Sequence, residues 1–202
     1  MDKKTRAVAW VKDRPFGVEF AEVTLTRRRL TARGVALGTV PVPYRPDYAL
    51  ETRAGFVTSR LWVSTRAQGW RRVLDLRREA SGIWSAAVVA EGETPLPPPG
   101  GEDARLAGAL DCDLGFSPLT NSLPVLRHQL LGGGGPVDLR VAWISVPDLA
   151  IYPDGQRYTY LQAGRGRHIV RYEAIDGTFA ADIVFDQDGI VIDYPGIARR
   201  LT

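Results

Sequence analysis

The segment DCDLGFSPLTNSLPVLRH, residues 111–128, sets the architecture of this chain, because it is the long segment that resembles neither a β-hairpin nor a loop. Asp111 and Asp113 end a predicted strand, and a Gly-Phe-Ser-Pro turn follows. Thr120 and Asn121 stand where helix caps are preferred, and Pro124 falls within the first turn, where proline is tolerated. Leucines then recur at the spacing of one helical face, at positions 119, 123, 126 and 130. The pattern predicts one short helix around residues 119–131.

Outside this segment, apolar and polar residues alternate over short runs that are separated by turn residues. Residues 56–66 show the alternation most clearly, and residues 179–185 carry an apolar face before the turn signal at 186–189. Gly34 and Gly38 interrupt a strand-like run, which predicts bulges or bends. We expect about ten to twelve strands, and tight connections between successive strands predict antiparallel pairing.

These features predict a mostly β protein with a single large antiparallel sheet. So many antiparallel strands do not stay flat, and we expect them to curl into a roll or an open barrel. Two stretches rich in proline or glycine, residues 94–101 and 132–136, read as surface loops. Because the sequence after the first loop does not look self-sufficient, residues 1–202 are predicted to form one domain.

The composition of the chain indicates which kinds of binding partner and cellular compartment to expect. The chain of 202 residues has 26 basic and 23 acidic residues, with one basic triplet at 27–29, and this spread predicts no nucleic-acid partner. Cys112 is the single cysteine, so no internal disulfide can form, which fits a cytoplasmic protein. No apolar run approaches the ~18 residues of a membrane span. The sequence predicts no cofactor.

The motif Asp111-x-Asp113 allows two readings. Alternate residues of a strand share a face, so both carboxylates could serve one hard cation or act as an acid–base pair. Alternatively, they accept hydrogen bonds from the turn and the helix start, or pair with an arginine. Cys112 would point to the opposite face and reads as a small buried side chain. His128 and His168 are the two histidines, which excludes a multi-histidine metal site.

Several predicted strand faces mix aromatic side chains with arginine. Such faces are either ordinary core aromatics with polar rims or the wall of a cleft for an amphiphile, whose polar head needs hydrogen-bonding groups. On the second reading we predict the following ligand-binding residues: Tyr48, Arg60, Trp62, Asn121, Arg127, Trp143 and Tyr158.

The central segment 111–124 resembles the signature of the bacterial putative glycolipid-binding family, long catalogued as a domain of unknown function. Further segments resemble the same family in order, at residues 44–48, 141–149, 156–158, 179–182 and 193–200. The resemblance implies a single-domain spiral β-roll, similar to bacterial lipoprotein carriers, and it brings no established catalytic residues. We therefore expect non-catalytic binding of an amphiphilic small molecule, with a glycolipid as the candidate. The alternative is a hydrolase or transferase that uses Asp111 and Asp113.

Overall fold

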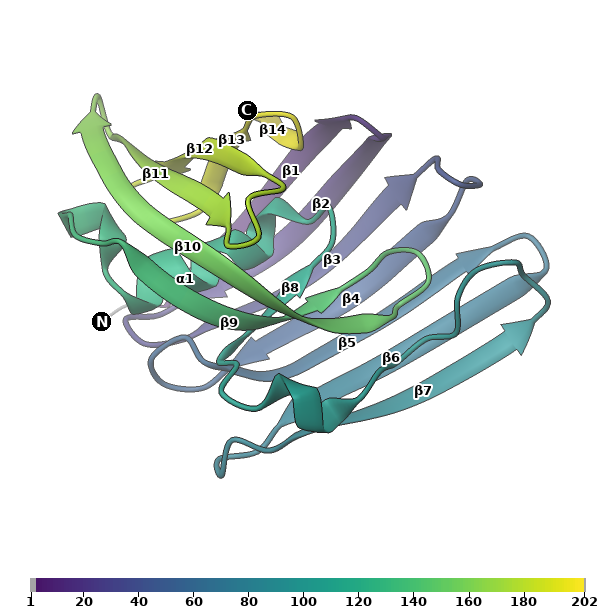
Figure 1. Ribbon diagram of the computed structural model, residues 1–202. Coiled ribbons are helices and arrows are strands. Elements are labelled where there is room, and N and C mark those ends of the chain that lie inside the picture. Colours follow the sequence, from purple (N-terminus) through teal and green to yellow (C-terminus); the bar gives the residue numbers. More distant parts are fainter. Residues whose placement is uncertain (1–2, 202) are drawn as a thin grey trace.

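The computed structural model describes residues 3–201, and its fourteen strands form one sheet (Figure 1). The first seven strands are β1 (Lys4–Asp13), β2 (Phe16–Leu25), β3 (Leu30–Gly38), β4 (Arg45–Thr52), β5 (Thr58–Ala67), β6 (Trp70–Arg78) and β7 (Trp84–Gly92). The other seven are β8 (Asp111–Leu114), β9 (Val137–Ile144), β10 (Ile151–Gly164), β11 (Arg167–Ala174), β12 (Ala180–Asp186), β13 (Val191–Tyr194) and β14 (Ala198–Leu201). The prediction of a mostly β fold with one large sheet is confirmed.

The sheet consists of two meanders that meet at its middle. The strand order is β7-β6-β5-β4-β3-β2-β1-β14-β13-β12-β11-β10-β9-β8, and β1 joins β14 with Ala9 opposite Leu201. Neighbours are antiparallel except β8 and β9, which are parallel. The predicted count of ten to twelve strands was too low. One of the missed strands, β4, follows a proline-rich loop, and Pro46 at its second position disguises it, although proline is tolerated near a strand start.

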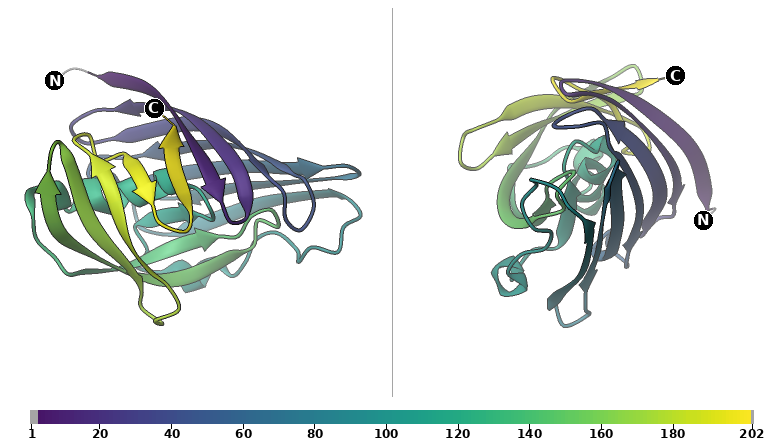
Figure 2. Two further views of the ribbon diagram at one scale, coloured as in Figure 1. Left: turned by 90° about the horizontal axis from the view of Figure 1, so that it is seen from above. Right: turned by 90° about the vertical axis from the view of Figure 1, so that its right-hand side faces the viewer.

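The sheet curls around the helical segment, as the end-on view shows (Figure 2, right). The curl brings the edge strand β8 inside, against β5: the Thr58 amide donates to the Leu110 carbonyl at 3.0 Å, and the Cys112 amide donates to Thr58 Oγ1 at 3.1 Å. A backbone edge that would otherwise lie open is thereby partly satisfied. The result is a spiral roll rather than a closed barrel.

The helical segment comprises η2 (Pro118–Asn121), α1 (Ser122–Arg127) and η3 (Leu130–Gly132); a separate 3₁₀ turn, η1 (Asp103–Leu106), precedes β8. The predicted short helix is confirmed, but the predicted caps are wrong. No side chain caps the start of α1. Thr120 Oγ1 instead donates to Asp113 Oδ1 at 2.7 Å. The hydroxyl that was expected to cap the helix therefore binds a side chain of β8.

The helical segment fills the interior of the roll. Leu119 and Leu123 belong to an apolar cluster with the inner face of β1–β6, while Val125 and Leu130 belong to a second cluster with β10–β13. All four side chains are at most 1% exposed, and burying one leucine fully contributes about 1.5–3 kcal/mol. This short segment therefore ties the two meanders together.

Gly34 and Gly38 do not mark bulges, since β3 pairs with β2 in unbroken register. Instead each glycine lies under the ring of the tyrosine that pairs with it on the adjacent segment. A Cβ on Gly34 would stand 2.3 Å from the Tyr48 ring, and one on Gly38 would stand 2.2 Å from the Tyr44 ring. The glycines are needed for this close approach of ring to backbone.

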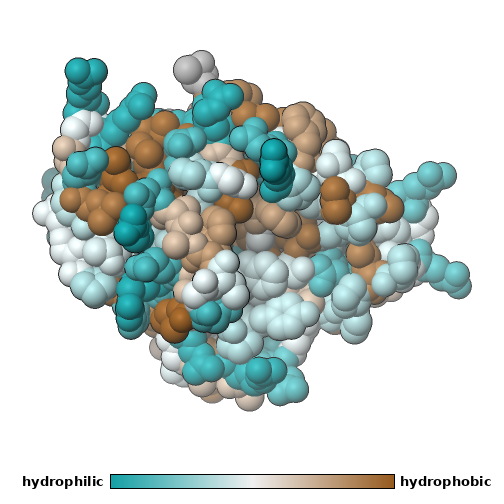
Figure 3. Space-filling model, turned by 45° about the horizontal axis from the view of Figure 1, so that its top comes forward, coloured by the Kyte–Doolittle hydropathy of each residue, from teal (hydrophilic) through white to brown (hydrophobic). Residues whose placement is uncertain are grey.

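The surface carries scattered apolar side chains between charged ones, which appear as separate brown areas in Figure 3. Phe16 and Leu37 on the outer face are more than half exposed. Within residues 3–201, no helix is both long and apolar enough to cross a membrane.

Candidate binding groove

A groove of about 560 Å³ opens between the loop after β8, the strands β9–β11 and the end of β13. Aromatic side chains from six different places along the chain form its walls: Phe116, Trp143, Tyr152, Tyr172, Phe179 and Tyr194. Its volume lies within the usual range of about 300–1,000 Å³ for small-molecule sites.

The aromatic rings pack against one another along the groove. The Trp143 and Tyr152 ring centroids are 5.8 Å apart, and the Tyr172 ring lies 5.9 Å from Phe179 and 6.1 Å from Tyr194. Tilted and edge-on contacts at these distances are the favoured aromatic geometry. The rings therefore hold each other in place and present a preformed apolar wall.

Two carboxylates border the groove, Asp113 on β8 and Asp154 on β10. The Gln156 side-chain amide links them, because its Nε2 donates to Asp113 Oδ2 at 2.7 Å and to Asp154 Oδ2 at 3.1 Å. Both side chains are half-buried, and desolvation raises the pKa of each carboxyl group. Within residues 3–201, neither forms an ion pair, so both retain acceptor capacity toward the groove.

Asp111, two residues before Asp113, lies outside the groove. Both of its oxygens accept hydrogen bonds from the Arg127 guanidinium, and Asp111 is buried. Of the two aspartates, Asp111 is therefore paired with an arginine and only Asp113 faces the groove. No three side chains of the His, Cys, Asp or Glu type gather into a possible metal site in the described chain. Burial raises the pKa of the intervening Cys112 thiol to about 12, which leaves it an inert thiol at neutral pH.

The structure distributes the seven predicted ligand-binding residues over three regions, of which the second and third share Tyr48. Asn121 and Trp143 line the groove, and Tyr158 lies beneath it, where its hydroxyl donates to Asn121 Oδ1 at 3.0 Å. Arg127 adjoins this region but is paired with Asp111. Arg60 and Trp62 line a depression on the outer face, where Arg60 Nε pairs with Asp75 Oδ1 at 2.7 Å.

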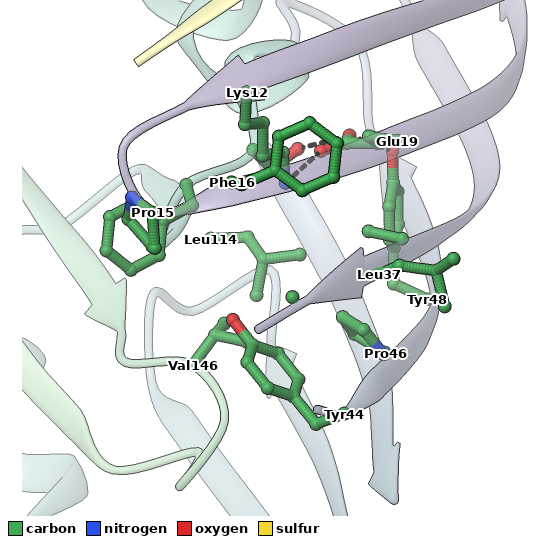
Figure 4. A pocket seen from close by; sticks show the side chains of 16 residues that line it. Lys12, Pro15, Phe16, Glu19, Leu37, Tyr44, Pro46, Tyr48, Leu114 and Val146 are labelled. Atoms are coloured by element: carbon green, nitrogen blue, oxygen red, sulfur yellow. Dashed lines mark hydrogen bonds and ion pairs between the residues drawn. The ribbon is translucent and has the colours of Figure 1, made fainter. Parts of the chain in front are cut away.

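Tyr48 also borders the depression lined by Arg60 and Trp62, but its hydroxyl belongs to the third region, a buried polar cluster on the far side of the loop 114–117 (Figure 4). Glu19 Oε1 accepts hydrogen bonds from the Tyr48 hydroxyl at 2.8 Å and from the Ser117 hydroxyl at 2.7 Å, while Lys12 Nζ lies 3.0 Å from Glu19 Oε2. The adjoining cavity of about 20 Å³ has room for a water molecule rather than a ligand. The cluster therefore serves to fix the loop that borders the groove.

Sequence reasoning missed most of the groove, including Asp154, Tyr172, Phe179 and Tyr194. Tyr172 and Tyr194 are each 7% exposed, so their alternation with polar neighbours is that of core residues. A usable signal was the presence of Phe179 and Tyr194 inside segments that resemble the family named above.

Comparison with known proteins confirms that resemblance. Residues 7–200 match the protein family described as "Putative glycolipid-binding". The structure is similar to the crystal structure of a DUF1089 family protein from Pseudomonas aeruginosa, with a TM-score of 0.70 and 27% sequence identity over 91% of this chain and 92% of the other. No curated protein matches the chain.

Proposed function

Because the chain belongs to the family described as "Putative glycolipid-binding", we propose that it binds an amphiphilic small molecule, a glycolipid, in the aromatic groove. One observation carries the proposal: the groove combines a wall of aromatic rings with two carboxylates that have no cationic partner among the described residues. Apolar walls with a few convergent polar groups are the usual composition of a small-molecule site.

The two kinds of side chain suit the two parts of such a ligand. Trp143, Tyr172 and Phe179 offer large apolar surfaces to a hydrocarbon chain or to the C–H face of a sugar ring. Asp113 and Asp154 accept hydrogen bonds, which sugar hydroxyls can donate, and the Asn121 amide lies in the same wall. Since Gln156 already orients both carboxylates, part of the ordering cost of binding is met before the ligand arrives.

Calorimetric titration with hexyl β-D-glucoside, a soluble glycolipid analogue, tests the proposal. Trp143→Ala should weaken binding by about 1–3 kcal/mol, the value of burying one large apolar side chain. Trp62→Ala is the matched control, because Trp62 is also a half-buried tryptophan but lies on the outer face. If only Trp62→Ala weakens binding, the outer depression is the site. If the wild type binds no alkyl glycoside of any headgroup, the proposal is wrong.

A hydrolase or transferase acting on the same ligand is a second candidate, favoured by one observation. Desolvation raises the pKa of both Asp113 and Asp154 toward neutral pH, and a carboxyl group with a raised pKa can exchange a proton with a substrate more readily. Arg127 is hydrogen-bonded to Asp111, which removes Asp111 from the acid–base pair expected from the sequence. Asp113 and Asp154 form the candidate pair instead. Release of 4-nitrophenol from alkyl esters or glycosides, abolished by Asp113→Asn, would support catalysis; its absence with every substrate would leave binding alone.

A further inference from the structure

The two aspartates are the charged side chains in the lining of the groove. Of the sixteen side chains and backbone positions that line it, two are aspartates and none is lysine, arginine or histidine. Asp176 stands close by on the β11–β12 turn, and hydrogen bonds from Thr178 lower the pKa of its carboxyl group, which keeps it ionised. Any headgroup that enters the groove therefore meets carboxylates without a compensating cation from its walls.

Three carboxylates lie near the tyrosines of the groove wall. Burial raises the pKa of the Tyr172 hydroxyl, and the charges of Asp113, Asp154 and Asp176 raise it further. Burial also raises the pKa of Tyr194, with Asp113 adding to the effect. Carboxylates on three different elements thus act on the same aromatic wall, and the potential there disfavours a second anion.

Two basic side chains of the interior already form ion pairs with carboxylates outside the groove. Arg127 is held by Asp111, and Lys12 is held by Glu19 behind the loop 114–117. Among the residues that line the groove, an anionic headgroup such as a phosphate would find no donor of opposite charge. A cation, by contrast, would satisfy carboxylates that otherwise stand half-buried and unpaired, and such compensation is strongly favourable in a partly desolvated site.

The aromatic wall favours the same ligand charge for an independent reason. Ring faces attract cations that lie within about 6 Å of the ring centroid, and the effect grows as water is excluded. Tyr172 contacts Tyr194 and Phe179, with centroids 6.1 Å and 5.9 Å away, so a cation among these rings would be near more than one of them. Carboxylates and aromatic faces in one groove are complementary to an ammonium group.

We propose that the groove selects amphiphiles whose polar head carries a positively charged ammonium group, such as an amino sugar, over amphiphiles with neutral or anionic heads. This inference rests on the proposed function for the location of the site. It adds the charge of the ligand, which the family description does not give.

Four probes with the same six-carbon tail test the selection by calorimetry at neutral pH and low salt: hexyl β-D-glucoside, its 2-amino-2-deoxy analogue, hexyltrimethylammonium and hexyl phosphate. The amino sugar should bind at least about tenfold more tightly than the glucoside, from which it differs by one ammonium group. Hexyl phosphate should bind most weakly. Raising the salt concentration should weaken the ammonium probes more than the glucoside. Hexyltrimethylammonium binding as tightly as the amino sugar would show that the ammonium group itself is recognised, whereas preference for the amino sugar would show that its hydroxyls are recognised with it.

Asp154→Asn keeps a hydrogen-bond acceptor but removes the charge, so it should reduce the affinity for the amino sugar about tenfold more than it reduces the affinity for the glucoside. Asp138→Asn is the control, because Asp138 is an exposed carboxylate on the neighbouring strand β9, outside the groove. Equal affinity for the amino sugar and the glucoside, or tighter binding of hexyl phosphate, would overturn the inference and leave the proposed function standing. If none of the four probes binds, the proposed function fails instead.

Discussion

Asp111 and Asp113 lie on the same strand, two residues apart, yet they belong to chemically different regions. Asp111 is buried and shares both oxygens with Arg127, whereas Asp113 is half-buried and receives only the neutral donors Thr120 and Gln156. A carboxylate whose two oxygens both accept hydrogen bonds from a guanidinium is not available to bind a ligand. The comparison shows that strand position brings two identical side chains to one face, but their partners decide which of them is available for binding.

The largest effect is expected where the charge pair is broken. Arg127→Met leaves Asp111 buried without a cation and should lower the free energy of unfolding by about 3–5 kcal/mol. Urea denaturation at neutral pH measures the loss. Arg171→Met removes an exposed partner of Asp182 and should cost less than about 1 kcal/mol. Losses of equal size in the two variants would remove the distinction between the two aspartates.

A smaller effect is expected at Asp113. In Asp113→Asn the amide can accept a hydrogen bond at only one of the two places where Thr120 and Gln156 now donate, so one of these two buried hydrogen bonds is lost. The expected loss is about 1–3 kcal/mol, measured by the same denaturation experiment. A loss larger than that of Arg127→Met would mean that Asp113, not Asp111, is the structural carboxylate.

The smallest expected effect is a change with pH in the stability that Asp113→Asn loses relative to the wild type. Desolvation raises the pKa of Asp113 in the folded state above its unfolded value, so the folded protein binds more protons in the interval between the two values. The wild type therefore loses stability as pH rises through this interval, while Asp113→Asn does not have this titration. The stability difference between them should be greatest below the ordinary aspartate pKa of about 3.9 and should shrink as pH rises above it. A difference that grows with pH would contradict the direction of the shift.

Much of the fold could be predicted from local pattern. Alternating residues in segments such as 179–185 gave strands, and the leucine spacing after residue 118 gave the helical segment, because burial on one face imposes these periods. What failed was non-local. Gly34 looked like a bulge because the Tyr48 ring, which needs the space of the missing side chain, comes from the opposite position on the next strand, β4.

The candidate site shows the same division. Asn121 was predicted as a hydrogen-bonding group for a polar head, and Trp143 as a large aromatic side chain on a strand face. Tyr172, Phe179 and Tyr194 become a wall only after β11, the turn that follows and β13 are brought together. No single stretch of sequence contains that arrangement, and the partner of a carboxylate such as Asp111 is likewise set by the tertiary fold.

The place where β1 meets β14 bears on how the molecule reaches its native state. Elsewhere in the two meanders, strands pair with their neighbours in sequence, whereas the pairing of Ala9 with Leu201 closes a loop of nearly the whole chain. By the logarithmic dependence of closure entropy on length, this seam costs about 3 kcal/mol more to close than a short hairpin. Each meander can therefore zip up from local contacts, and the seam is expected to form last, which pulsed hydrogen exchange at the amides of β1 and β14 would reveal.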